Sequence, residues 1–515
     1  MGLFAARAHK VWDGGSHVWR RTDPLLLAVG AVAFFTYWQH GFGGKFSRDP
    51  GVYAYGARQV LEGQPPYVGI VNRAGPLAHL LPVPGVVAAR VTGKDELLGM
   101  RFWYMLLATA CVVLAYVVVR GIFASRTVGL AAAATMLSFE GFIHLATTGP
   151  REKTPMVLFM LCATWALTRQ RWILTGVFIG LATLTLQIAF PPLCAAAIVG
   201  VPMLARDRTV RALGLVVAGG GIPVVATVAY FAASGALGDL IDGFLLLNAR
   251  YTHGRSILSR PEKIWTSMQL GFGDSLWLLL GGLAALVVLA ALRLGERTSR
   301  REPATAVLVA SVAATLVGLA WTLLDFDSWV DAFPFLPFAA IGIGAVIAEV
   351  ERRLPSGVSL AVAGAVVLPA TLLAMHFSAA AAAHTLNKQR ATVRAVLQNV
   401  PDATIWSIEA PEVLVLARRT NPTRHQLFSE GLQHNLGDTW PGGIKGFVAW
   451  NLKRRPDLIV VGRDELRDRE WKDRIGPAYV VVARAPGSVW FARRSLGADV
   501  IASIRETRHA HRTGR

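Results

Sequence analysis

Apolar runs long enough to approach the thickness of a membrane recur along the first three quarters of the chain. A helix needs roughly 20 apolar residues to cross the hydrocarbon core of a bilayer. The pattern predicts eleven such spans, and the three between residues 155 and 205 are short. The spans are predicted at 25–41, 102–119, 127–147, 155–168, 173–187, 189–205, 213–234, 271–292, 304–324, 334–350 and 357–376.

Lysine and arginine side chains fall in alternate connections between these spans. Connections rich in cations stay in the cytoplasm, so we expect a cytoplasmic N-terminus and, after an odd number of spans, an outside C-terminal region. The connections near 187–190 and 325–333 hold no Lys or Arg. The inside set is Arg7, Lys10, Arg20, Arg21, Arg120, Arg126, Arg169, Arg171, Arg206, Arg208, Arg211, Arg293, Arg297, Arg300, Arg301, Arg352 and Arg353.

Three segments lie outside the predicted spans on the outer side. They are the long loop 42–100, the segment 235–270 and the region after residue 385. In the last, β-rich runs at 404–408 and 457–461, with a hairpin around a Pro-Gly turn at 479–493, predict an α/β domain. The fold class is therefore a polytopic α-helical membrane protein: a cytoplasmic N-terminus 1–24, a transmembrane domain 25–376 and an extracytoplasmic α/β domain 385–515.

Composition supports a membrane protein and excludes other classes. Of the 515 residues, 53% are hydrophobic and 17% charged, against roughly 25% charged in soluble domains. The net charge of +19 is spread over loops and tail without a basic stripe interleaved with aromatics, so no nucleic-acid partner is expected. Cys111, Cys162 and Cys194 each lie in an apolar run, which predicts packing residues rather than disulfides or a thiolate metal site.

Ionisable residues are costly within a membrane, and here they gather near the outer ends of the spans. Such a cluster at one surface suits a reaction at the membrane boundary better than passage through its middle. No zinc-type spacing, P-loop, dinucleotide fingerprint or nucleophile elbow occurs. The cluster comprises Asp49, Glu140, His144, Arg151, Glu152, Lys153, Asp325, Asp327 and Asp331.

Each member also has a purely structural interpretation. Asp49 could cap a helix or a turn, because Asp-Pro commonly starts turns. The run 151–153 could be a solvated turn. Glu140 and His144, four residues apart on one helix face, could satisfy each other. The acids at 325–331 could cap helices.

The order of features after the first predicted span resembles the first outer loop of the GT-C glycosyltransferases. The resemblance is greatest to the protein-mannosyltransferase-like and aminoarabinose-transferase-like branch. It rests on the loop's acid, tyrosine, Glu-Gly-Tyr and Pro-Leu order, and it continues through residue 205. The segments that carry it are Asp49–Arg58, Leu61–Tyr67, Asn72–Leu77, Thr147–Leu158, Leu184–Gln187 and Pro191–Leu193.

The resemblance implies roles for particular residues. Asp49 is the expected general base, or the carboxylate that holds a metal or the acceptor, and Glu152 looks like the second outer-loop acid. Arg151, Lys153 and Arg73 are expected to bind the donor phosphate. Asp49 and Glu152 would also hold a divalent cation, Mg²⁺ or Mn²⁺, and no other cofactor is implied. The remaining candidates for substrate binding are Tyr53, Tyr67, His144 and Gln187.

The sequence departs from the family pattern at three places. Asn72–Gly75 replaces an acidic and Lys-Pro-Pro run, Gln187 stands where many members carry Lys, and the His-Tyr before the proline of a late span is absent. These departures bear on the identity of the donor and on phosphate binding more than on the class of reaction.

The resemblance thus implies a plasma-membrane glycosyltransferase with an inverting mechanism. Its donor would be a polyprenyl-phosphate sugar, and its acceptor an extracytoplasmic glycan, glycolipid or protein. Mannose and arabinofuranose are the natural candidate sugars for an Ala-, Arg-, Val- and Gly-rich chain from a GC-rich genome. Two alternatives stay open: a transporter or flippase of lipid-linked saccharides, and a structural partner that recruits envelope enzymes.

Overall fold

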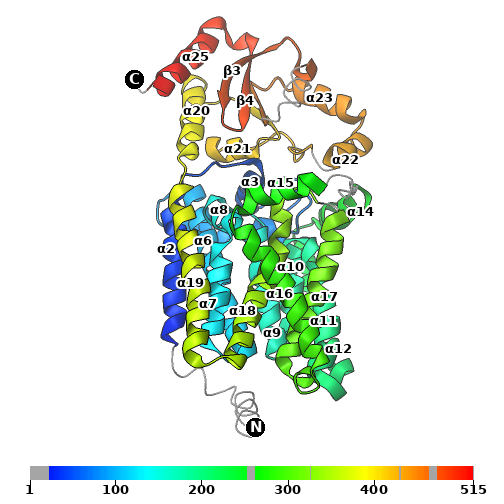
Figure 1. Cartoon of the computed structure of the whole chain (residues 1–515). Helices are drawn as coiled ribbons and strands as arrows, with labels where there is room; N and C mark the ends of the chain where they lie inside the picture. Colours follow the sequence, from blue (N-terminus) through cyan, green and yellow to red (C-terminus); the bar gives the residue numbers. More distant parts are fainter. Residues whose placement is uncertain (1–22, 252–260, 325, 429–430, 463–472, 514–515) are drawn as a thin grey trace.

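The computed structural model describes residues 23–251, 261–324, 326–428, 431–462 and 473–513. It consists of a bundle of long helices and a smaller α/β domain at one end of the bundle (Figure 1). We call the end that carries this domain the domain face and the other the opposite face. Several residues named above lie outside the described residues: Arg7, Lys10, Arg20, Arg21 and Asp325.

The bundle is built from helices rich in Leu, Val and Ala that pack into one large apolar core. Each predicted span falls on one of these helices or on a pair of them. The helices are α2 (Pro24–His40), α6 (Glu96–Phe123), α7 (Arg126–Ser138), α8 (Glu140–Thr148), α9 (Lys153–Thr168), α10 (Trp172–Thr185), α11 (Phe190–Ala205), α12 (Thr209–Ala233), α16 (Ser275–Gly295), α17 (Pro303–Leu324), α18 (Leu336–Arg353) and α19 (Ser356–Ala380).

The chain is a multi-pass membrane protein, but length and apolarity do not identify every predicted span. Within the described residues, six helical stretches are long and apolar enough to cross a membrane, or seven if one bent pair counts as a span. Two of the six, 187–233 and 356–399, include shorter helical segments in series, and α9 and α10 are shorter apolar helices. The number eleven therefore stays a prediction.

The predicted span over 127–147 is bent and consists of two helices. α7 and α8 meet at an angle of 66°. Phe139 between them has extended backbone angles (φ −68°, ψ 104°), which interrupt the helical hydrogen bonding. The Ser275 hydroxyl instead accepts a hydrogen bond from the Glu140 amide at 3.1 Å. The bend brings the end of α8 to the domain face.

Short helices cover the domain face of the bundle. The first predicted outer loop forms three of them before α6 begins, and the other connections supply the rest. They are α3 (Arg48–Leu61), α4 (Leu77–Leu80), α5 (Val83–Val91), α13 (Leu237–Leu240), the π-helix η4 (Ile241–Leu246), α14 (Leu247–Tyr251), α15 (Pro261–Phe272) and the 3-10 helix η7 (Trp329–Phe335).

The C-terminal region forms a four-stranded mixed sheet with helices around it, close to the predicted strand positions. The strand order is β1-β2-β4-β3, with β1 parallel to β2 and the β3–β4 hairpin antiparallel. Its elements are α20 (Thr385–Asn399), β1 (Ile405–Ile408), α21 (Pro411–Ala417), α22 (Leu432–Thr439), α23 (Gly443–Lys453), β2 (Leu458–Gly462), β3 (Tyr479–Ala485), β4 (Ser488–Arg493) and α25 (Ala498–Thr513).

The α/β domain and the first outer loop share one hydrophobic core. Val52 and Ala54 of α3 belong to the same buried cluster as Val413 and Leu414 of α21. Gly51 allows this close approach, because a Cβ there would lie 2.5 Å from the Glu412 amide nitrogen. The backbone of Val71 also donates to the Arg424 carbonyl at 3.0 Å. The domain is therefore seated firmly on the loop that carries Asp49.

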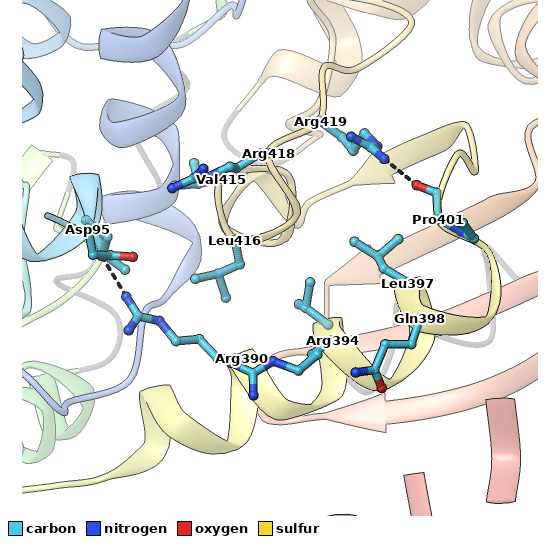
Figure 2. A pocket seen from close by; sticks show the side chains of 12 residues that line it. Asp95, Arg390, Arg394, Leu397, Gln398, Pro401, Val415, Leu416, Arg418 and Arg419 are labelled. Carbon is cyan, nitrogen blue, oxygen red and sulfur yellow. Dashed lines mark hydrogen bonds and ion pairs between the residues drawn. The ribbon is translucent and has the colours of Figure 1, made fainter. Parts of the chain in front are cut away.

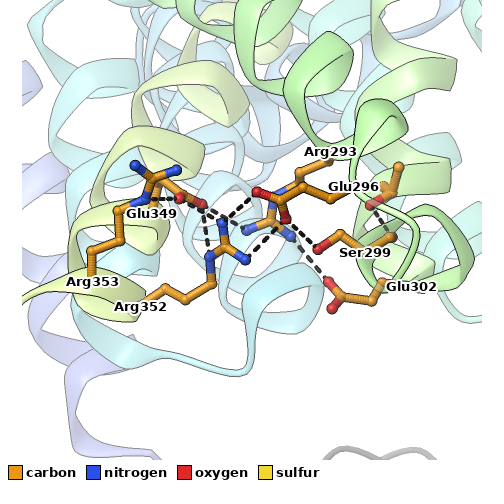
Figure 3. A network of polar contacts seen from close by, with 8 residues as sticks. Arg293, Glu296, Ser299, Glu302, Glu349, Arg352 and Arg353 are labelled. Atoms are coloured by element: carbon orange, nitrogen blue, oxygen red, sulfur yellow. Dashed lines mark hydrogen bonds and ion pairs between the residues drawn. The ribbon is translucent and has the colours of Figure 1, made fainter.

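At the opposite face, arginines that were predicted to lie inside form a network of ion pairs with glutamates (Figure 3). Arg352 donates to both carboxylate oxygens of Glu296 at 3.1 Å and to Glu349 at 2.7 Å. Arg293 pairs with Glu302 at 3.2 Å. These contacts join the ends of α16 and α18 to the start of α17. The exposed pair of Arg352 and Glu296 contributes little stability, so its main effect is on the positions of the helix ends.

Candidate functional site

Asp49 lies in the first turn of α3, where the chain enters the helix from the outer loop. Proline at position 50 suits a first turn, and a carboxylate there faces the positive end of the helix dipole. Arg48 donates to Asp49 at 3.0 Å and Arg151 approaches its other oxygen at 2.8 Å. Burial alone would raise the pKa of Asp49, but Arg151 and Arg48 outweigh it and hold this pKa below its usual value. Asp49 is thus a carboxylate at neutral pH.

The run 151–153 is not a solvated turn, so that structural interpretation is wrong. Glu152 and Lys153 are each only 5% exposed, at the start of α9. Lys153 forms an ion pair with Asp331, which in turn accepts hydrogen bonds from the amides of Asp327 and Ser328. The predicted capping role holds for Asp331, which completes a capping box at the start of η7.

Glu152 connects Arg151 to the tyrosine of the outer loop. Its carboxylate lies 3.7 Å from the Arg151 Nε, and one of its buried oxygens has no hydrogen-bond partner among the described residues. Burial, and then the charges of Glu152 and Asp49, raise the pKa of Tyr53 well above its ordinary value. Tyr53 therefore stays a neutral hydroxyl beside two carboxylates. The structure thus brings together five predicted site residues: Asp49, Tyr53, Arg151, Glu152 and Lys153.

His144 lies near this group but does not pair with Glu140. Its ring packs edge-on against His40, with 5.8 Å between ring centroids. The Glu140 side chain instead lies beside the backbone at the start of α16, and its own amide donates to the Ser275 hydroxyl at 3.1 Å. The expectation that Glu140 and His144 satisfy each other is wrong, because the bend after α7 turns Glu140 toward α16.

The other three predicted residues form a second group that holds the outer loop. Gln187 and Asn248 both donate to the Arg73 carbonyl at 3.1 Å, and the Tyr67 hydroxyl donates to the Ala74 carbonyl at 2.7 Å. The polar atoms of Tyr67 and Gln187 are thus used on backbone groups. Gln187 and Asn248 thus fix the loop that follows α3 against the turn after α10 and against α14.

The buried ring of His79 separates the two groups. It lies 5.7 Å from the Tyr53 ring and 6.1 Å from the Tyr67 ring, between centroids. Burial lowers the pKa of His79 to about 4, so this imidazole is neutral at physiological pH. Its Nε2 lies 3.2 Å from Asn72 Oδ1. His79 therefore packs the two tyrosines in place without adding charge.

Sequence reasoning missed the contribution of the C-terminal domain. Glu409, which directly follows β1, accepts from Arg48 at 3.0 Å and also from the Phe428 amide. An ion-pair chain thus runs from Glu409 through Arg48 and Asp49 to Arg151. The signal was present, because ligand-contacting side chains commonly follow the carboxyl ends of parallel strands. Glu409 is a positioning residue for Arg48.

Glu412 is a second buried acid of this domain, and its ionisation should affect stability. Burial raises the pKa of Glu412 to about 8, whereas the unfolded value is 4.5. The folded state then retains a proton between about pH 4.5 and 8 that the unfolded state lacks, so stability falls as pH rises through this window.

We expect Glu412→Gln to remove this loss. The variant should unfold several degrees above wild type at pH 8.5 and close to it at pH 5.5, as followed by tryptophan fluorescence on heating. Asp402→Asn, at an exposed acid of the same domain, serves as the control and should show no such difference. Equal melting of wild type and Glu412→Gln at both pH values would contradict a buried, protonated Glu412.

The donor set around Asp49 does not favour a resident metal. Among the described residues, no three His, Cys, Asp or Glu side chains are grouped so that they could hold a metal ion. The Asp49 carboxylate is already paired with two guanidinium groups, and their charge repels a cation. The predicted Mg²⁺ or Mn²⁺ bridge between Asp49 and Glu152 stays a prediction, and no step below depends on it.

Comparison with known proteins relates the chain to a family model and to solved structures of the same fold. The model of Glycosyltransferase family 87 matches residues 82–324. Two crystal structures of ArnT from Cupriavidus metallidurans superimpose on the chain. The apo form gives a TM-score of 0.63 and the form bound to undecaprenyl phosphate gives 0.60. Each is 14% identical and covers 92% of this chain and 98% of its own. No curated protein sequence matches.

The chain has the GT-C fold. The resemblance stated from the outer-loop motif is therefore confirmed at the level of the superfamily. The family match begins after Asp49, so the outer-loop acid is placed by the motif and by the geometry above rather than by that match. In this GT-C chain the Asp49–Arg151 pair lies on the domain face, where α3 meets the turn before α9.

Proposed function

We propose that this chain is an integral membrane glycosyltransferase that moves a sugar from a polyprenyl-phosphate donor to an acceptor outside the cytoplasm. The observation that carries the proposal is the Asp49 carboxylate held between Arg48 and Arg151 at the domain face. A lipid-linked donor presents its head group at such a boundary. One of the two matching ArnT structures holds undecaprenyl phosphate, which supports a polyprenyl phosphate as the lipid.

A displacement at the anomeric carbon needs a base for the acceptor hydroxyl and positive charge for the departing phosphate, and the side chains around Asp49 supply both. The acceptor hydroxyl attacks that carbon, a new carbon–oxygen bond forms, and the bond to the phosphate oxygen breaks with inversion. Asp49 takes the proton of the hydroxyl, and Arg151 and Arg48 stabilise the charge on the departing polyprenyl phosphate. A phosphate that draws Arg151 away would also raise the pKa of Asp49, because that guanidinium lowers it. Donor binding would thereby make Asp49 a stronger base.

The proposal also includes the orientation of the chain in the membrane and the side on which the acceptor lies. The connections that carry the predicted inside cations, such as those between α6 and α7 and between α18 and α19, lie at the opposite face (Figure 1). Their charge supports a cytoplasmic opposite face and an extracytoplasmic domain face. The acceptor is then a glycan, glycolipid or protein of the cell envelope, and mannose or arabinofuranose is the first sugar to test.

Purified full-length protein in proteoliposomes tests the reaction class. We expect one member of a panel of radiolabelled polyprenyl-phosphate sugars to release polyprenyl phosphate and to label a cell-envelope fraction supplied as acceptor. Empty liposomes provide the control. Movement of the intact lipid-linked sugar across the bilayer without cleavage would instead establish the transporter, and no cleavage of any donor would contradict the transferase.

A further inference from the structure

A pocket of about 600 Å³ with charged and apolar walls lies between the α/β domain and the start of α6 (Figure 2). Its size is within the range of small-molecule sites. Helix α20 forms one wall and the end of α21 forms the other, and the Leu416 side chain of α21 points into the space between the two helices. The lining residues are Asp95, Leu97, Arg390, Val393, Arg394, Leu397, Gln398, Pro401, Val415, Leu416, Arg418 and Arg419.

The charge of this pocket is strongly unbalanced. Four arginines line it against one acid. Arg390 is paired with Asp95 at 2.7 Å, and Arg419 donates to the Pro401 carbonyl. Within the part of the chain that the structure describes, Arg394 and Arg418 make no ion pair or side-chain hydrogen bond, and both are exposed. Two guanidinium groups are therefore free to bind an anion.

The backbone holds one of these two arginines in an unusual position. Arg418 ends α21 in the left-handed conformation (φ 52°, ψ 48°), where glycine or asparagine is preferred. A residue with a Cβ is sterically disfavoured in this conformation and lowers the stability of the folded state. The presence of arginine there therefore calls for an explanation in terms of its side chain. Figure 2 shows Arg418 at the end of α21, on the other side of the pocket from Arg390 and Arg394 of α20.

The pocket is distinct from the Asp49 site. Helices α3 and α21 lie side by side: Gly51 contacts Glu412 near one end, and Arg58 donates to the Val415 carbonyl at 3.2 Å near the other. Asp49 and Arg58 are nine residues apart on α3, which is roughly 14 Å along a helix. The pocket opens at the Val415 end, so a ligand there does not occupy the place of the reacting sugar.

We propose that this pocket binds a phosphate group carried by a small saccharide-like head group. Guanidinium forks match phosphate oxygens in pairs, and charge-assisted hydrogen bonds of this kind are among the strongest in proteins. The leucine and valine side chains that line the pocket provide apolar surface for the C–H faces of a sugar or glycerol unit. The same chemistry occurs in a soluble sugar phosphate and in the head group of a phospholipid. The pocket would take either as a second ligand beside the donor.

Equilibrium binding to the full-length protein in nanodiscs tests this site without measuring transfer. The soluble probe is glucose 6-phosphate, measured by calorimetry in nanodiscs of zwitterionic lipid. The lipid probe is a fluorescent phosphatidylglycerol, offered in vesicles. The test variant is the double substitution Arg394→Gln and Arg418→Gln. Lys388→Gln with Lys445→Gln removes the same charge from exposed positions of α20 and α23 outside the pocket.

We expect the pocket variant to weaken binding by about tenfold or more, since a hydrogen bond to a charged group contributes roughly 1.5–3 kcal/mol. The control pair should bind within about twofold of wild type, the scatter allowed for surface charge. Loss of glucose 6-phosphate binding in the pocket variant identifies a soluble sugar phosphate, and loss confined to the vesicle probe identifies a lipid head group. Equal binding by the pocket variant and the control pair, or no binding of either probe to wild type, would overturn the proposal. Asp49→Asn should bind both probes as wild type does. The binding result therefore tests the pocket even if the protein proves not to be a transferase.

Discussion

Asp49→Asn should lower the turnover number for sugar transfer by about 10³-fold or more, because a placed general base contributes roughly 10²–10⁴ to such a step. The substitution keeps the size of the side chain and its hydrogen-bond acceptor but removes the negative charge. Arg48 and Arg151 would then lose the carboxylate that they share. Turnover is measured as release of polyprenyl phosphate by the purified variant in proteoliposomes, at saturating donor.

A matched control separates catalysis from a general effect of removing an acid. Asp402 is an exposed acid of the C-terminal domain, between α20 and β1, and its side chain forms no ion pair among the described residues. Asp402→Asn should stay within about twofold of wild type, as expected for a surface substitution. Both variants should melt close to wild type. Normal turnover in Asp49→Asn would remove the basis of the proposed mechanism.

The long elements could be predicted because each one repeats a simple pattern. Apolar runs located the long helices of the bundle but not the short helices of the outer segments, such as α3 and α15. Short β-rich runs located β1 and β2, since burial on both sides requires continuous apolar residues. The bend between α7 and α8 could not be predicted. It depends on one extended residue, Phe139, and on a hydroxyl of Ser275 that is 135 residues further along the chain than Glu140. No local pattern contains that information.

The site was accessible to sequence reasoning only where its residues are close in sequence or share a motif. Asp49 and the run 151–153 lie at the ends of predicted spans, so one surface was expected to hold them. Glu409 comes from a separate domain, 361 residues beyond the Arg48 with which it pairs. That contact follows from the seating of α21 on α3, which depends on the shared apolar core rather than on charge. The hydrogen bonds of Tyr67 and Gln187 could not be predicted for the same reason, because their partners are backbone carbonyls positioned by the tertiary fold. The substrate-binding roles expected of these two residues stay predictions.

Arg151→Gln should lower kcat/KM by about 10²-fold or more and should also shift its pH dependence. The loss in rate follows from removing a preorganised cation from the departing phosphate. The shift follows from linkage, because Arg151 is the strongest of the charges that lower the pKa of Asp49. In wild type, the acid limb of the kcat/KM profile should therefore lie below pH 4, the ordinary range of an aspartate. Without Arg151 the pKa of Asp49 rises, so the acid limb should move to higher pH.

The two readouts distinguish a direct role from a structural one. A variant that only destabilised the turn before α9 would lose activity at every pH and would leave the position of the acid limb unchanged. Arg90→Gln removes an exposed arginine that pairs with Glu96 on α5 and α6 at 2.8 Å, away from Asp49. It should change kcat/KM by no more than about twofold and should leave the position of the acid limb unchanged.

If Arg151→Gln keeps wild-type kcat/KM, the departing phosphate is held elsewhere. Arg48 then becomes the residue to test, because it is the other cation on the same carboxylate. If the rate falls without a shift of the limb, Asp49 is not the group whose proton uptake limits the reaction.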